Sequence, residues 1–253
     1  MDDEPDMRSA PPSSGPGALS VVELARLPGR AALIGLAGVA CGIALSLALG
    51  LLGLAIAPHI RAVRLLGGQI GLWTGLVGAC VLVSRRYGTG SLRDDFAVRA
   101  EGRDVARGVG ISIAGRFAGG LVAVPLIGLN RRFAGTNTYV FQRLRSDKPT
   151  YLLLAIIAAI GAPLVEELFF RGLMMRALER PFGLTGSLVA QALLFGCAHI
   201  NPLFGLGNVS VVAVTATLGV ILGITARRFG RLGPGMLAHG FFNLVAVVVI
   251  AAQ

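Results

Sequence analysis

The chain has 253 residues, of which 54% are hydrophobic and only 14% are charged. Soluble domains carry about 25% charged residues, so this composition excludes an ordinary soluble domain and indicates an integral membrane protein. The net charge of +10 does not indicate a nucleic-acid partner, because most of the basic residues lie in short loops between apolar runs. Loops rich in arginine are typical of membrane proteins, so lipid is the expected surrounding partner and nucleic acid is not expected.

The first 29 residues are polar, and acidic side chains open them. A secretory signal peptide begins with basic residues and continues into an apolar stretch, which this segment does not. We therefore predict a disordered cytoplasmic tail at 1–29. The remainder, 30–253, is predicted to form one transmembrane helical domain.

Apolar runs then follow one another and predict an all-α fold, a polytopic membrane bundle of about seven or eight transmembrane helices. A spanning helix needs about 20 residues, so the fifth and sixth runs are short, and a tilted or re-entrant arrangement is expected there. Loop arginines predict a cytoplasmic N-terminus and an external C-terminus. The predicted helices cover residues 31–57, 65–84, 105–129, 150–177, 185–200, 209–226 and 234–252.

Two acidic residues, Glu166 and Glu167, are the only ones of 13 that lie well inside an apolar run. A carboxylate at that depth costs at least a few kcal/mol, which points to a function. Arg171 follows Glu167 by four residues and shares its helix face, so we predict an ion pair. Glu166 points about 100° away and is predicted to be the free carboxylate. The competing interpretation, a charged patch at the membrane interface, is disfavoured because the apolar run continues past Arg171.

Two of the three histidines, His199 and His239, also lie in membrane runs, and Asn243 follows His239 by one helical turn. Histidine titrates near neutral pH, and together with a carboxylate it can activate water and stabilise an oxyanion. The HExxH zinc motif, the GxSxG nucleophile and a pair of membrane aspartates are missing from the sequence. We therefore expect Glu166, His199, His239 and Asn243 to line one pocket, open to the cytoplasmic side, with glutamate-based chemistry.

Three short motifs carry a resemblance to a known family. EELFFR (166–171) matches EExxxR, FGCAH (195–199) matches FxxxH, and HGFFN (239–243) matches HxxxN. In this order, on separate apolar runs, they resemble the CPBP family, which contains CAAX prenyl proteases and bacteriocin-processing or immunity-type proteins and is also called the Abi family. The resemblance covers about 150–245, which is the expected catalytic core.

The resemblance implies an intramembrane endopeptidase, and its expected location is a bacterial plasma membrane. Its substrate would be a membrane-anchored peptide, including prenylated CAAX-like tails. Glu166 would activate water together with His199, while His239 and Asn243 would hold the oxyanion. The residues Glu167, Arg171 and Phe195 would have supporting roles.

Other functions remain open at this stage. A non-enzymatic scaffold or immunity protein could keep the motifs for stability. A proton-coupled transporter could use Glu166, His199 and His239 as a relay, although such folds show repeats that this sequence lacks. The same three residues could in principle hold zinc. We expect no cofactor, because neither histidine has an evident supporting carboxylate in the sequence.

Overall fold

The structure is a computed structural model that describes residues 27–136 and 138–253, so most of the predicted tail at 1–29 lies outside it. Within the described residues the chain forms helices and no strand. Six segments of the described part of the chain are long and apolar enough to cross a membrane. The longest, Lys148–Cys197, has non-helical backbone at Gly183 and therefore comprises two helices, which gives the seven predicted from sequence. The all-α membrane bundle is thus confirmed, and the protein is an integral membrane protein.

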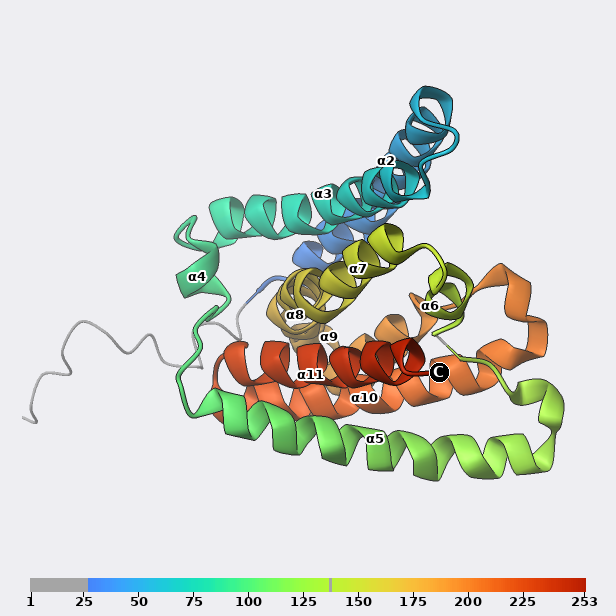
Figure 1. The fold of residues 1–253 in the computed structure, drawn as a ribbon. Coiled ribbons are helices and arrows are strands. Elements are labelled where there is room, and N and C mark those ends of the chain that lie inside the picture. The colour runs from blue at the N-terminus through green and yellow to red at the C-terminus, as the bar shows by residue number, and fades with distance from the viewer. Residues whose placement is uncertain (1–26, 137) are drawn as a thin grey trace, which may run out of the picture.

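The first two helices, α2 (Arg30–Ile56) and α3 (Arg61–Tyr87), form an antiparallel hairpin that stands at one side of the molecule (Figure 1). Their contact depends on glycine, because a Cβ on Gly75 would clash with the carbonyl oxygen of Gly38. Such close backbone approach is typical of helix pairs in lipid. The short helix α4 (Leu92–Asp95) then leads into α5.

Three long helices, α5 (Asp104–Leu129), α10 (Asn208–Phe229) and α11 (Gly233–Ala251), lie side by side (Figure 1). The turn from α10 to α11 is fixed to the segment after α4, where the Leu232 N–H donates to the Ala97 carbonyl at 3.1 Å. We call this side of the bundle the α4 end; α2 begins and α3 ends there. The opposite side is the α6 end.

The α6 end holds the turns and short helices that join the long ones. The connector from α5 contains η1 (Arg131–Phe133), a 3₁₀ turn, and α6 (Tyr139–Leu144). A second 3₁₀ segment, η4 (Pro202–Gly207), leads into α10. The C-terminus lies at this end as well (Figure 1).

The helix that carries both glutamates is irregular. It runs through α7 (Lys148–Ile156), the π turn η2 (Ile157–Gly161), α8 (Ala162–Glu167) and the π segment η3 (Leu168–Met174), and it continues into α9 (Met175–Cys197). After the break at Gly183 the fifth helix, 184–197, is about 21 Å long, which is short as expected. The sixth was expected to be short too, but α10 has 22 residues and is long enough to span.

Candidate functional site

A proline shapes the backbone in front of the two glutamates. Pro163 has no N–H, so it cannot donate to a carbonyl in the preceding turn. The chain forms a π turn there, in which the Ala162 N–H donates to the carbonyl of Ile157. The carbonyl of Ala158, left without a helical donor, accepts a hydrogen bond from Nδ2 of Asn243 at 2.8 Å. The glutamate helix is thereby tied to α11, and π turns of this kind are frequent at functional sites.

Close packing of the two backbones permits this tie. A Cβ on Gly240 would lie 2.7 Å from the carbonyl oxygen of Ala159, so only glycine lets α11 approach η2 so closely. Asn243 and His239 lie on the neighbouring face of α11 and turn toward the glutamate helix.

The predicted ion pair between Glu167 and Arg171 is confirmed. Nη1 of Arg171 donates to Oε1 of Glu167 at 2.8 Å, and both side chains are completely buried. Nη2 of Arg171 donates to the Gly219 carbonyl on α10, and the guanidinium lies 4.4 Å from the ring centroid of Phe195. The pair therefore connects three helices, and removal of either partner would leave a buried charge uncompensated.

His239 lies between the two glutamates. Its Nδ1 is 3.1 Å from Oε1 of Glu167, and its Nε2 is 3.8 Å from Oε2 of Glu166. An ion-paired carboxylate only accepts hydrogen bonds, so Nδ1 of His239 carries a proton and donates it to Glu167. The Nε2 atom is therefore held toward Glu166, whose side chain is 20% exposed while that of Glu167 is not exposed at all.

Phe195 brings the second histidine to the same region. Its buried ring lies 4.7 Å from the ring of His199 and 5.6 Å from that of His239, edge to face in both cases. His199 is one helical turn beyond Phe195, and its Nδ1 donates to the Phe195 carbonyl at 2.7 Å. Counted along straight helices, His199 and His239 would lie at different depths. In the structure both histidine rings nevertheless contact the ring of Phe195. No hydrogen bond or ion pair joins His199 to Glu166.

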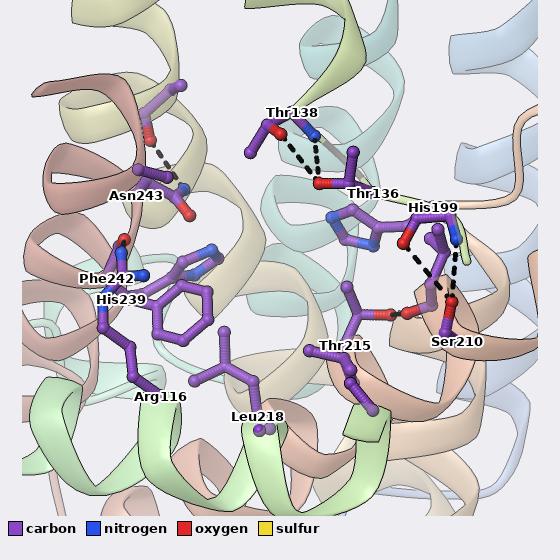
Figure 2. A pocket seen from close by; sticks show the side chains of 18 of the residues that line it. Arg116, Thr136, Thr138, His199, Ser210, Thr215, Leu218, His239, Phe242 and Asn243 are labelled. Atoms are coloured by element: carbon purple, nitrogen blue, oxygen red, sulfur yellow. Dashed lines mark hydrogen bonds between the residues drawn. The ribbon is translucent and has the colours of Figure 1, made fainter. Parts of the chain in front are cut away.

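A cavity of about 380 Å³, which we call the central pocket, lies among α5, α6, α10, α11 and the end of α9. Of the four predicted site residues, His199, His239 and Asn243 line it. Figure 2 shows His239 and Asn243 on one wall and His199 on the other. Glu166 is not part of the lining and contacts the pocket through His239.

The pocket lies toward the α6 end, because Thr136, Thr138 and Phe141 of the α5–α7 connector line it. The N-terminal helix α2 begins at the α4 end. The sequence predicted both a cytoplasmic N-terminus and a pocket open to the cytoplasm. The side of the membrane on which the N-terminus lies and the side to which the pocket opens both stay predictions.

The residues that could hold zinc do not fit such an ion. Among the described residues no three histidine, cysteine, aspartate or glutamate side chains converge to form a metal site. One sequence argument about metal was nevertheless wrong, since Glu167 does provide His239 with a supporting carboxylate.

Several residues around the pocket were not predicted. Gln191 is fully buried, and its Nε2 donates to the same Gly219 carbonyl that Arg171 contacts. Its place in an apolar run, one turn before Phe195, is a signal that could have revealed it. Arg116 of α5 and the connector threonines also line the pocket. The threonines carry no sequence signal, because their proximity to His199 depends on the path of the connector.

Comparison with known proteins adds one finding. Residues 148–245 match the family described as type II CAAX prenyl endopeptidase Rce1-like. No curated protein matches the chain, and no solved structure matches it. The matched segment begins with α7 and ends within α11, so it contains both glutamates, both pocket histidines and Asn243. Residues 148–245 are thus similar to the Rce1-like type II CAAX prenyl endopeptidases, and this similarity covers the part of the chain that carries the candidate site.

Proposed function

We propose that this protein hydrolyses a peptide bond of a membrane-anchored substrate with a water molecule that Glu166 activates. The observation that carries the proposal is the contact between Glu166 and His239. Glu166 is partly exposed and 3.8 Å from Nε2 of His239, whereas its neighbour Glu167 is buried and committed to Arg171. Glu166 is thus the glutamate that can reach water.

In the proposed reaction Glu166 takes a proton from water, and the water oxygen attacks the carbonyl carbon of the scissile bond. His239, when its ring carries both protons, donates from Nε2 to the oxyanion. Asn243 uses one Nδ2 hydrogen on Ala158 and keeps a second for the oxyanion. Glu166 then gives its proton to the leaving nitrogen as the carbon–nitrogen bond breaks.

His199 has a separate place in this scheme. Its Nδ1–H is held by the Phe195 carbonyl, so Nε2 of the neutral ring is an acceptor. It lies on the wall of the pocket that faces His239 (Figure 2). We propose that it orients the attacking water or the substrate chain from that wall.

We propose that an apolar groove beside the pocket holds the lipid chain of the substrate. An apolar groove of about 310 Å³ lies between the glutamate helix and α11, and Ile160, Leu164 and Phe241 are among its lining residues. It adjoins the face of α11 that carries His239 and Asn243. This groove supports a prenylated peptide as the substrate, with its lipid held outside the pocket and its peptide inside.

The test is hydrolysis by the purified protein in detergent, followed by mass spectrometry. A farnesylated peptide ending in Cys-aliphatic-aliphatic-X should be cut to a shorter farnesylated product and a released tail. The matched peptide without the farnesyl group should be cut more slowly. If the protein hydrolyses neither these peptides nor other membrane-anchored peptides, the proposed function is wrong.

A further inference from the structure

An arginine lies in the middle of a membrane-spanning helix. Arg116 is close to the midpoint of α5, about 18 Å from its start and about 20 Å from its end at 1.5 Å per residue. Ionisable side chains at such depth are costly and face the bundle interior or a water-filled cavity. Arg116 follows this rule, since it lines the central pocket.

The contacts of Arg116 leave its charge without a counter-ion. One guanidinium nitrogen donates to the Phe242 carbonyl, and the guanidinium stacks 4.5 Å from the centroid of the Phe242 ring. Its Nε is buried and has no hydrogen-bond partner. Among the described residues no carboxylate lies within 4.0 Å of it, and no other arginine or lysine lines the pocket.

Two other arginines have the carboxylate counter-ion that Arg116 lacks. Arg107, on the same helix, also stacks on a phenylalanine ring, that of Phe229 at 4.8 Å, but it pairs with Asp104 at 2.9 Å. Arg171 pairs with Glu167. Arg116 has the aromatic contact without the carboxylate.

We propose that Arg116 binds a carboxylate of the peptide substrate. The guanidinium presents several donors in a planar fork that matches a carboxylate. Phe242, which holds Arg116, is the residue before Asn243, so the bound carboxylate lies beside the reacting peptide bond in the same pocket. A lipid phosphate does not reach this depth, because head groups lie outside the hydrocarbon core. This inference rests on the proposed function for the identity of the ligand as a peptide.

Binding, measured separately from cleavage, provides the test. The host is the Glu166→Gln variant, which should bind peptide without hydrolysing it. The probes are the farnesylated Cys-aliphatic-aliphatic-X peptide as the C-terminal acid and as the amide. A second pair, both amides, has Asp or Asn at the last position. We expect a carboxylate to tighten binding by roughly tenfold to a hundredfold, the range for a hydrogen bond to a charged group.

The comparison that decides is between arginine variants in that host. Arg116→Gln keeps a donor for the Phe242 carbonyl but loses the charge, so the preference for the carboxylate should fall to about one. Arg116→Lys should keep part of it. Arg107→Gln, the matched control, should keep all of it. A preference confined to the first probe pair assigns the C-terminal carboxylate, and one in the second pair assigns a side chain.

Two results overturn the inference: no carboxylate preference in either probe pair with Arg116 present, or a preference that survives Arg116→Gln. The proposed function is tested by hydrolysis and not by this binding preference. If the wild type shows the preference but hydrolyses nothing, only the proposed function fails. If it hydrolyses the peptides but shows no carboxylate preference in either probe pair, only the inference about Arg116 fails.

Discussion

Glu167 accepts a hydrogen bond from Nδ1 of His239 at 3.1 Å, and this contact determines which ring nitrogen faces Glu166. The two adjacent glutamates therefore have different places around one histidine. Glu167 is buried and ion-paired, while Glu166 is partly exposed and 3.8 Å from Nε2. The proposed chemistry follows from this difference in burial between two neighbouring residues of the same type.

Replacement of Glu167 by glutamine tests the orienting contact. The amide cannot form the ion pair with Arg171, and it can present an N–H to His239 and thereby favour the wrong ring tautomer. We expect kcat to fall about tenfold to a hundredfold, by analogy with the loss of partners that orient metal-binding histidines. Cleavage kinetics check this, with Glu179→Gln as the control, because the salt bridge of Glu179 with Arg227 lies away from the site. Unchanged kcat would show that the contact does not orient His239.

Arg171→Ala tests the buried ion pair itself. It leaves the carboxylate of Glu167 buried without a counter-charge, so folding stability should fall by about 3–5 kcal/mol. The double variant Glu167→Gln/Arg171→Met removes both charges and should recover part of the loss. Thermal unfolding in detergent measures both variants. Equal stability of wild type and Arg171→Ala would mean that the pair does not stabilise the fold.

Asn243→Ala tests the tie between the glutamate helix and α11. It leaves the Ala158 carbonyl without its donor, which should cost about 1–3 kcal/mol for a buried acceptor. Hydrogen exchange should become faster in 157–166 relative to α3. Exchange that is unchanged in that segment would show that the π turn does not depend on Asn243.

The loop after α3 should give the protein a sensitivity to acid. Burial raises the pKa of Asp95, but hydrogen bonds from Ser84, Thr89 and Gly90 outweigh it and hold the pKa below its ordinary value of 3.8. A carboxyl group with a lowered folded-state pKa stabilises the fold above its unfolded pKa. That stability is lost as the pH falls below about 3.8 and through the folded-state pKa.

Asp95→Asn should therefore lower the melting temperature at pH 6. The difference from wild type should shrink at pH 3, because that pH lies below the ordinary carboxyl pKa of 3.8, where the stabilisation begins to be lost. Asp94→Asn is the neighbouring control, since the Asp94 carboxylate accepts a hydrogen bond from the Ser91 hydroxyl and takes no part in the hydrogen bonds of Asp95. A melting-temperature difference that is the same at both pH values would contradict the assigned hydrogen bonds.

Much of the fold could be predicted because the long helices coincide with apolar runs in the sequence. The Glu167–Arg171 contact could be predicted as well, since residues four apart on a helix are neighbours. The contact of Glu167 with His239 could not, because it depends on how α11 is rotated against another helix. Helical periodicity gives the faces of one helix and not their pairing with the next.

The position of the pocket could not be predicted from the sequence either. Its place at the α6 end depends on the connector at 130–147 folding against α10, where Ser210 donates to the Phe133 carbonyl. The charge of Arg116 was visible in the sequence, but an arginine in an apolar run reveals neither its partner nor the absence of one. Both features arise from packing between segments that are distant in the chain.

The most direct test of the central claim is the rate of peptide cleavage by Glu166→Gln. Glutamine keeps the size of the side chain but cannot take a proton from water, and general-base catalysis is typically worth about a hundredfold to ten-thousandfold. We predict at least about a hundredfold loss of kcat on the farnesylated peptide, with the melting temperature of the wild type and full activity in the Glu179→Gln control. Cleavage by Glu166→Gln at the wild-type rate would contradict the account.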